Sequence, residues 1–300
     1  MAQPVLLPYT SAITNIKLPT TVEIRACDHV LHERHAAKIV AISDEVVVKF
    51  GGGVTEAEGQ ALVYLERHVP QIPAPRLYSM YHDSDQLFLV MQRIPGTQLE
   101  QLWPSLTNAE KDNLSEQLGV IFTSLRATPC PVPNLFSSVD GGSIQRYLFY
   151  DQSGEQQNMG PFYGEVSFVK GLIGNLRAYR ERNGRPAQKA DFYEKHLPNV
   201  LRGHRAVLTH GDVQKRNIIV TERSDSSPGS EARARQFDVT LVDWEMAGWL
   251  PDYWEYFCAS LMFLLVGWDG EDDWCWQAGR FLPVFLAETA VMREFDKDMQ

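Results

Sequence analysis

The sequence predicts an α+β protein with a smaller part made mainly of strands and a larger part made mainly of helices. Runs rich in β-branched and aromatic residues, among them "DEVVVKF" and "QLFLVMQRIPG", occur before residue 97. After residue 107, apolar residues recur at helical spacing instead. Because Pro95 and Gly96 stop the last of the early strands, we expect one domain over residues 1–94 and a second over residues 95–300.

The smaller part is expected to begin with a strand-like segment from about residue 21 to 50 and to turn at the glycines 51–53. One helix is predicted over residues 55–68, because Thr55 and Glu58 have the spacing of a capping box and an apolar stripe follows them. The segment "VPQIPAPRLY" after this helix is predicted to be extended, since a proline disfavours the helical conformation of the residue before it.

The larger part opens with a second capping-box spacing, Thr107 with Glu110, which predicts the start of a long helix. Further helices are expected over about 166–182 and 189–202. The segment 128–165 is rich in Pro, Gly and Ser and predicts no particular element. The chain from residue 251 onward has a helical pattern.

The composition argues against several classes of partner. A net charge of -10 and a pI of about 5.3 do not suit a nucleic-acid-binding surface, which must be basic. The four cysteines lie far apart, so neither a zinc site nor a disulfide framework is indicated, and we expect a reducing, cytoplasmic location. The most apolar run, "YFCASLMFLLVGW", is too short to span a bilayer, and the N-terminus lacks a secretion-signal pattern. We therefore expect no membrane partner.

The stretch "VLTHGDVQKRNIIV", residues 207–220, places Asp212 and Asn217 between two strand-like runs. A third strand, "FDVTLVDWE", carries Asp243 at its end. An amide oxygen and a carboxylate are ligands that Mg²⁺ accepts alongside nucleotide phosphates. The residues therefore predict that Asn217 and Asp243 hold Mg²⁺, while Asp212 receives or orients the proton of an attacking hydroxyl group.

Two motifs in this order, "HGDVQKRN" and then "VDWEMAGW", resemble those of the aminoglycoside phosphotransferase and choline kinase-like family, in particular its fungal members. The resemblance implies a two-lobed, protein-kinase-like fold with a small, mainly β N-lobe containing one helix and a larger, mainly α C-lobe. It further implies an enzyme that moves the γ-phosphoryl group of ATP to a hydroxyl group of a small molecule. Matching material extends from about residue 40 to 256.

The resemblance also assigns the nucleotide site. It implies that Lys49 contacts the α- and β-phosphates and that Glu58 orients this lysine. It places the backbone groups of Gln92 and Ile94 near the adenine, with Met91 behind it. GTP remains an alternative to ATP.

Several of these residues have a second interpretation. Glu58 could instead bond the backbone amide of Thr55, and Glu56 competes with it as the partner of the lysine. Lys215 is a candidate catalytic residue that would neutralise the transferring phosphate, but it could equally face solvent. His210 is expected to support the loop through a hydrogen bond rather than to bind a metal.

One departure from the kinase pattern concerns the loop that covers the phosphates. That loop is glycine-rich in protein kinases, whereas residues 26–40 contain no glycine. A non-catalytic, kinase-like module that binds a small molecule or a protein is therefore the alternative function.

The acceptor is not identified by the sequence. The stretch "DGEDDWCWQ", residues 269–277, could bind a cationic acceptor through its carboxylates and through Trp274 or Trp276. It could equally be an exposed acidic start of a helix with tryptophans packed inward. We favour this second interpretation.

Overall fold

The structure is a computed structural model that describes residues 4–12, 16–34, 36–149, 159–223, 235–266 and 273–299. The chain forms two compact units, which we describe separately. The β-rich unit comprises Gln3–Glu110 and Lys215–Glu245, and the helical unit comprises Lys111–Gln214 and Met246–Gln300. The domain boundary expected after residue 94 remains a prediction. Within the described ranges, no helix has both the length and the apolar character needed to cross a membrane.

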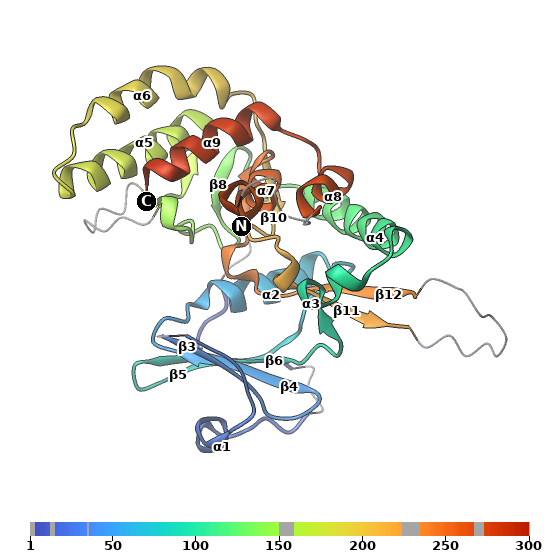
Figure 1. Ribbon diagram of the computed structural model, residues 1–300. Helices are drawn as coiled ribbons and strands as arrows, with labels where there is room; N and C mark the ends of the chain where they lie inside the picture. Colours follow the sequence, from blue (N-terminus) through green and yellow to red (C-terminus); the bar gives the residue numbers. More distant parts are fainter. Residues whose placement is uncertain are drawn as a thin grey trace. The chain divides into compact units, whose positions relative to one another are not determined.

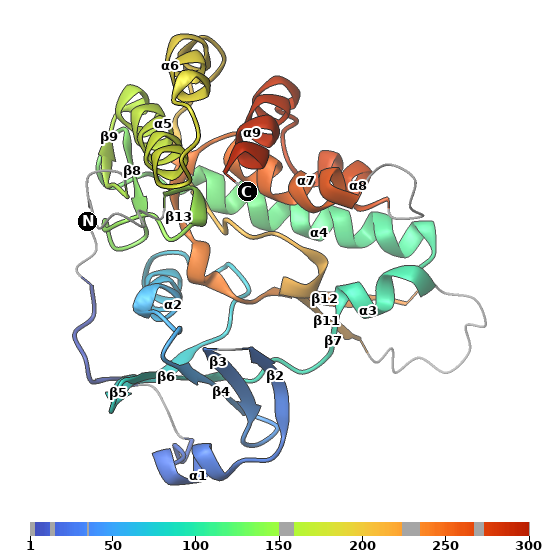
Figure 2. The ribbon, with the colours of Figure 1, turned by 60° about the vertical axis from the view of Figure 1, so that its left-hand side comes forward.

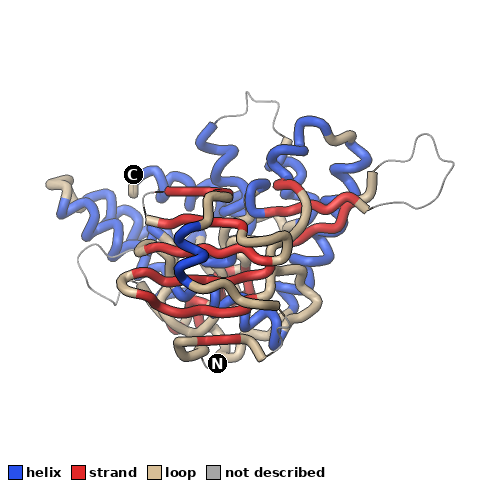
Figure 3. The backbone as a smooth tube through the Cα atoms, turned by 90° about the horizontal axis from the view of Figure 1, so that it is seen from below, coloured by secondary structure: helices blue, strands red, loops and turns tan. Residues whose placement is uncertain are grey.

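The β-rich unit is built on a six-stranded sheet in the order β1-β5-β6-β4-β3-β2, in which every neighbouring pair is antiparallel. Figure 3 shows these strands side by side. Their bounds are Tyr9–Thr10 (β1), Val30–Arg34 (β2), Ala37–Ala41 (β3), Val46–Gly51 (β4), Leu77–Asp83 (β5) and Gln86–Gln92 (β6). The strands β4 and β6 confirm the two early runs predicted from the sequence.

A helix lies on each face of this sheet. Helix α1, Thr21–Ala26, buries Ile24 against one face in a cluster with Val48 and Phe88. Helix α2, Glu56–His68, lies on the other face, where Gly59 approaches Met80 closely. The prediction of a helix over residues 55–68 is thus confirmed, and α2 sits on the face opposite to α1.

Helix α1 was not expected, because residues 21–50 were predicted to be strand-like throughout. The segment begins with a capping box, in which the Glu23 amide donates to Thr20 Oγ1 and the Thr20 amide donates to Glu23 Oε2. These bonds satisfy backbone groups that a strand would have to pair with a neighbour. The β-branched residues here misled the prediction, since Val22 faces solvent on a helix.

The rest of the β-rich unit is a three-stranded antiparallel sheet in the order β12-β11-β7. Its strands are Thr97–Gln98 (β7), Ile218–Glu222 (β11) and Phe237–Leu241 (β12), and the short helices Leu99–Leu102 (α3) and Trp103–Ser105 (η1) follow β7. The strands predicted on both sides of the "HGDVQKRN" motif and before "VDWE" are confirmed.

The helical unit combines a four-stranded antiparallel sheet, in the order β10-β13-β8-β9, with long helices (Figure 1). Its strands are Leu135–Ser138 (β8), Phe162–Tyr163 (β9), Ala206–Thr209 (β10) and Gly248–Pro251 (β13). Its helices are Asn108–Ala127 (α4), Glu165–Arg182 (α5), Gln188–Val200 (α6), Trp254–Val266 (α7), Trp274–Phe281 (α8) and Leu286–Asp298 (α9), and α4 begins in the β-rich unit. The helices predicted at 166–182 and 189–202 are α5 and α6.

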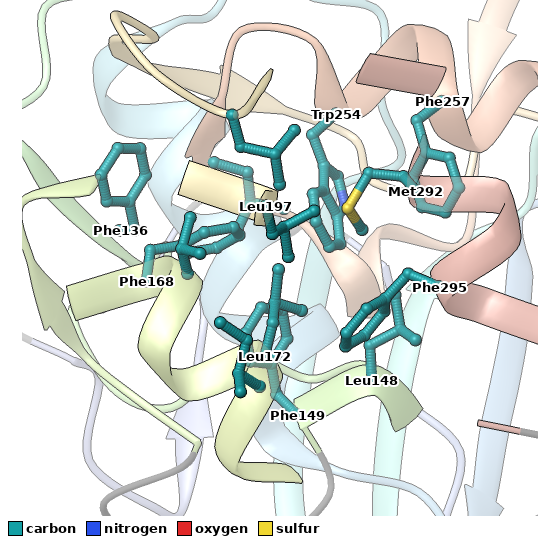
Figure 4. Close-up of a cluster of buried hydrophobic side chains, with 14 of the residues drawn as sticks. Phe136, Leu148, Phe149, Phe168, Leu172, Leu197, Trp254, Phe257, Met292 and Phe295 are labelled. Carbon is teal, nitrogen blue, oxygen red and sulfur yellow. The ribbon is translucent and has the colours of Figure 1, made fainter. Parts of the chain in front are cut away.

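An aromatic cluster fills the core of the helical unit. Figure 4 shows Phe149 and Phe168 packed with Trp254, and the ring centroids of Phe168 and Trp254 lie 5.6 Å apart, edge to face. Phe149 belongs to segment 128–165, for which the sequence predicted no element. Buried aromatic residues of this segment therefore tie it to α5 and α7.

The acidic, tryptophan-containing stretch 269–277 is described only from Asp273 onward. Trp274 is buried and packs on Phe281, whereas Trp276 is 75% exposed. Inward packing is thus seen for one of the two tryptophans, and residues 269–272 lie outside the described ranges.

The N-terminus of α4 is held by hydrogen bonds to the carboxylate of Glu110. The Thr107 amide and hydroxyl both donate to Glu110 Oε2, and the Arg235 guanidinium donates to Glu110 Oε1 at 2.9 Å. The capping box predicted for Thr107 and Glu110 is therefore confirmed. The hydrogen bond from Arg235, followed by those from Thr107, lowers the pKa of Glu110 to about 2.

We expect Glu110→Gln to lower the free energy of unfolding by about 1.5–3 kcal/mol at pH 7, the range for hydrogen bonds to a charged group. A carboxyl group that is more acidic in the folded protein stabilises it fully above its ordinary pKa of 4.5. The difference between wild type and variant should therefore shrink as the pH falls from about 4.5 towards 2. Urea denaturation across this range measures it, with Glu116→Gln, an exposed residue of the same helix, as the control. An unchanged difference at low pH would contradict the assignment.

Candidate active site

One buried polar site of the β-rich unit is centred on the ammonium group of Lys49. Lys49 Nζ donates to Glu58 Oε2 at 2.8 Å, to Asp243 Oδ1 at 2.8 Å and to Glu245 Oε2 at 2.9 Å. The side chains of Lys49 and Glu58 are 10% and 5% exposed, while those of Asp243 and Glu245 are each 36% exposed. We call these four residues the Lys49 cluster.

Three elements bring the cluster together. Lys49 is in the middle of β4 and points to the face covered by α2, whose first turn carries Glu58. Asp243 and Glu245 follow β12, where the chain bends sharply and Asp243 has a φ of 64°. Aspartate tolerates this left-handed conformation better than most residues. The cluster therefore joins the sheet, α2 and the end of the "VDWE" motif.

The structure resolves the two interpretations of Glu58. Its carboxylate is bonded to Lys49, and Thr55 makes no side-chain capping hydrogen bond. Glu56 points elsewhere and lies 3.7 Å from His82 on the surface. The pairing of Lys49 with Glu58 is confirmed as a contact, and the capping-box alternative is wrong.

Burial and charge shift the pKa values of the cluster in a consistent way. Burial alone would lower the pKa of Lys49, but the adjacent carboxylates outweigh it and raise that pKa well above its ordinary value. Burial raises the pKa of Glu58, because it is the least solvated of three carboxylates that share one ammonium group. The cluster thus holds a firmly charged lysine beside an excess of negative charge.

Asn217 directly precedes β11, which pairs with β12, the strand before Asp243. It is buried, and its carbonyl oxygen accepts a hydrogen bond from the Val242 amide at 2.9 Å, which places it beside the residue that precedes Asp243. Oxygen atoms of Glu58, Asp243 and Glu245 lie within 4.8 Å of one another. Carboxylate oxygens are hard donors, so these three carboxylates fit the coordination chemistry of Mg²⁺. The role of the Asn217 side chain as a ligand stays a prediction.

The predicted adenine-contacting residues lie at the end of β6. Met91 is buried, and the Gln92 amide donates to the Arg76 carbonyl group at 2.9 Å. Ile94 follows the strand, and its backbone N–H and C=O groups form no hydrogen bond with any described residue. Ile94 thus offers both backbone groups, whereas the amide of Gln92 is engaged within its own unit.

Lys215 adjoins the aromatic side chain of Trp103. Its ammonium group lies 5.4 Å from the centroid of the Trp103 ring, which is within the range of a cation–π contact. Neither of the two roles considered for Lys215, phosphate neutralisation or simple exposure to solvent, follows from this contact alone.

Asp212 lies in the helical unit, on the loop that follows β10. The Gln214 side-chain amide donates to Asp212 Oδ1 at 2.6 Å, and the Asp212 backbone amide donates to His210 Nδ1 at 3.3 Å. His210 is fully buried, and the hydrogen bond that its ring accepts from the Asp212 amide confirms its expected role as a support of the loop. Gly211 has a φ of 81°, and a Cβ there would clash with the Met246 carbonyl oxygen, so only glycine fits this turn.

Two buried charged residues, Glu255 and Arg146, form hydrogen bonds with the backbone of this loop. Glu255 in α7 accepts the His210 amide at 2.7 Å and the Gly211 amide at 3.1 Å. Arg146 donates to the Gly211 carbonyl oxygen at 2.7 Å. Burial raises the pKa of Glu255, and the two amide donors partly offset this rise. The backbone beside Asp212 is therefore fixed on both its donor and acceptor sides.

Sequence reasoning did not identify Glu245, Glu255 or Arg146. Glu245 stands two residues after Asp243, so the "DWE" triplet already contained a signal for it. Glu255 lies in the segment "PDYWEY", residues 251–256, but nothing local shows that it bonds a loop 44 residues earlier. Arg146 carries no recognisable signal in its surrounding sequence.

Comparison with known proteins adds a family assignment to this geometry. The sequence model of the phosphotransferase enzyme family matches residues 45–273, which include the Lys49 cluster and the Asp212 loop. A search of curated proteins found none that matches the chain.

Solved structures of aminoglycoside phosphotransferases share the fold at low sequence identity. The ADP-bound structure of APH(2'')-Ib aligns with a TM-score of 0.59 at 15% identity, over 90% of this chain and 84% of that one. A thermostable mutant of APH(4)-Ia in complex with ADP and hygromycin B gives 0.56 at 13% identity, over 90% and 81%. The ternary complex of streptomycin, ATP and APH(2'')-IIa gives 0.51 at 14% identity, over 81% and 76%.

The Lys49 cluster predicts a specific pattern of stability. We expect Lys49→Met to destabilise the protein by about 3–5 kcal/mol, because it leaves the buried Glu58 carboxylate without its counter-ion. The double variant Lys49→Met with Glu58→Gln should recover much of this loss, since the charge is removed together with its partner. Chemical denaturation of the single and double variants measures both effects.

Lys38→Met is the matched control for this experiment. Lys38 lies on the neighbouring strand β3, and its 3.9 Å ion pair with Glu33 is at the surface, so the change should be within about 1 kcal/mol. Equal losses for Lys49→Met and Lys38→Met, or no recovery in the double variant, would contradict the cluster.

Proposed function

Because the chain belongs to the phosphotransferase enzyme family, we propose that it moves the γ-phosphoryl group of ATP, with Mg²⁺, to a hydroxyl group of a small molecule. The observation that carries the proposal is the Lys49 cluster, in which a buried lysine is held by carboxylates from α2 and from the "VDWE" motif. A binding module that had lost catalysis would not need this arrangement, and no observation favours that alternative.

Lys49 is the phosphate-binding cation of the proposed site. When nucleotide binds, its ammonium group contacts the α- and β-phosphates and keeps Glu58 as its buried partner. Asp243 is more exposed than Glu58, so exchanging its bond to Lys49 for another cation has a lower desolvation cost. Asn217 and Asp243 would hold Mg²⁺, which supplies charge neutralisation at the phosphate oxygens.

Asp212 is the proposed proton acceptor. The oxygen of the acceptor hydroxyl group forms a bond to the γ-phosphorus, the bond to the β,γ-bridging oxygen breaks, and ADP leaves. The proton of the hydroxyl group passes to Asp212, whose Oδ1 is oriented by Gln214. Glu255 and Arg146 keep the backbone of this loop in one conformation.

The adenine is proposed to bind beside the end of β6. Ile94 supplies a backbone donor and acceptor that no described residue uses, and Met91 provides a buried apolar surface next to it. Gln92 contributes through its backbone carbonyl group in this proposal, since its amide donates to the Arg76 carbonyl group and its side-chain oxygen accepts from the Arg76 amide. GTP remains the alternative nucleotide.

The acceptor is proposed to be a polar small molecule with a free hydroxyl group. Structures with the same fold carry streptomycin and hygromycin B, which are hydroxyl-rich and cationic. The net charge of -10 suits a cationic acceptor and does not suit a nucleic acid. We place the reaction in the cytoplasm, where ATP is available and the described thiols of Cys27, Cys130, Cys258 and Cys275 stay reduced.

Nucleotide binding is the first expected outcome. At a ligand concentration a hundred times the Kd, ATP with Mg²⁺ should stabilise the wild type by about 2.7 kcal/mol, seen as a rise of a few degrees in Tm. Asp243→Asn should lose the magnesium-dependent part of this rise. Asp238→Asn, at an exposed carboxylate of β12, serves as the control and should behave like wild type. If the rise in Tm on ATP binding is the same with and without Mg²⁺ in the wild type and in both variants, the metal site is contradicted.

The catalytic role of Asp212 gives a separate expectation. Asp212→Asn should lower turnover by a factor of about 10² to 10⁴, because the positioned proton acceptor is lost, while ATP binding stays close to wild type. Release of ADP is measured with streptomycin, hygromycin B and choline as trial acceptors. Asp191→Asn, at an exposed residue of α6, is the control. Full turnover by Asp212→Asn with an acceptor that the wild type uses would rule out the role.

A further inference from the structure

The β2–β3 hairpin, residues 30–41, forms one edge of the six-stranded sheet (Figure 2). Strand β3 lies between β2 and β4, so the hairpin adjoins the strand that carries Lys49. Every residue of β2 is exposed, from Val30 to Arg34. In protein kinases a glycine-rich loop at the phosphates supplies backbone amides to them, but this hairpin contains no glycine.

The strand register decides which side chains share a face with Lys49. Ile39 of β3 is directly opposite Lys49 and also directly opposite His32 of β2. Directly opposite residues point to the same face of an antiparallel sheet, and residues two apart along a strand do so as well. His32 and Arg34 therefore lie on the face of Lys49, whereas Lys38, which pairs with Phe50, lies on the opposite face.

The charges of the hairpin differ between the two faces. On the face opposite to Lys49, Lys38 pairs with Glu33 at 3.9 Å. On the face of Lys49, the side chains of His32 and Arg34 make no ion pair or hydrogen bond with any residue in the described ranges. The side chains of His32 and Arg34 therefore lie on the same face of the sheet as Lys49. Strand β2, which carries them, is two strand spacings, or roughly 10 Å, from β4.

Glycines that follow Lys49, outside the hairpin, contact the hairpin at Ala36. The Gly53 amide donates to the Ala36 carbonyl oxygen at 2.8 Å. Gly51 has a φ of 147°, and a Cβ at this position would clash with the same carbonyl oxygen. The glycines after Lys49 thus allow Ala36 to contact the end of β4 closely, and this contact fixes the position of Ala36 relative to β4.

From these observations we propose that His32 and Arg34 form a second anion subsite, which binds phosphate oxygens of the nucleotide held by Lys49. The side-chain N–H groups of His32 and Arg34 would here take over the part that backbone amides play in a glycine-rich loop. A guanidinium group suits this task, because its planar N–H groups can bind two phosphate oxygens at once. The inference rests on the proposed function, since it needs a nucleotide at Lys49.

The experiment measures calorimetric affinities for adenosine, AMP, ADP and ATP in the wild type and in Arg34→Gln, His32→Gln and Lys38→Gln. Arg34→Gln should weaken ATP binding about tenfold, the value of one charge-assisted hydrogen bond, and should leave adenosine binding unchanged. The loss should grow with the number of phosphates, and Arg34→Lys should restore part of it. Lys38→Gln, in the same hairpin but on the other face, should match the wild type.

The outcomes separate this inference from the proposed function. Wild-type ATP binding that Arg34→Gln and His32→Gln leave intact would overturn the subsite and leave the phosphotransferase proposal standing. Equal losses in Arg34→Gln and Lys38→Gln would also overturn it, because they would indicate a general charge effect. Absence of ATP binding in the wild type would overturn both proposals. Because β2 is wholly exposed, the His32 and Arg34 variants should keep the wild-type Tm without nucleotide.

Discussion

The ammonium group of Lys49 is the point on which the β-rich unit depends. It sits in the interior of the sheet and binds three carboxylates, two of which come from a chain segment nearly 200 residues away, with a separation of 194 to Asp243. Neither Lys49 nor Glu58 would be tolerable unpaired at this depth, since an unpaired buried ion costs several kcal/mol. The lysine therefore fixes α2 against the sheet and at the same time fixes the end of β12.

In the helical unit, buried charged side chains are paired with backbone groups instead of with one another. Its loop between β10 and Asp212 has a left-handed glycine and two amides that point into the protein, and Glu255 accepts both of them. Arg146 then pairs with the carbonyl group of the same glycine. A buried carboxylate and a buried guanidinium group here stabilise a backbone conformation, whereas in the Lys49 cluster the charges bind one another. In both places the carboxylate with a proposed chemical role is more exposed than a buried carboxylate beside it: Asp243 is more exposed than Glu58, and Asp212 is more exposed than Glu255.

The sequence predicted those parts of the fold whose signals are local. The strands β4, β6, β10, β11 and β12 are apolar runs, and α2 and α4 have a helical stripe. The capping box predicted for α4 forms, whereas the one predicted for α2 does not. Helix α1 was missed because its β-branched residues are typical of strands and its capping box was overlooked. Strands β8 and β9 were missed because they are short and lie among Pro, Gly and Ser residues, where only tertiary pairing defines a strand. In the site, Lys49 and Glu58 were paired correctly, but Arg146 and Glu255 bond a loop distant in sequence, and no local pattern contains such a bond.

The division of the β-rich unit into two chain segments sets an order of events during synthesis. All six strands of the large sheet and Glu58 leave the ribosome early, whereas Asp243 follows Lys49 after 194 residues. At 5–20 residues per second, this interval is about 10 to 40 s. During that time Lys49 and Glu58 neutralise each other without the two later carboxylates. The nascent sheet is thus charge-balanced before the helical unit exists, and the excess negative charge that suits a divalent cation arises only when the chain returns to complete it.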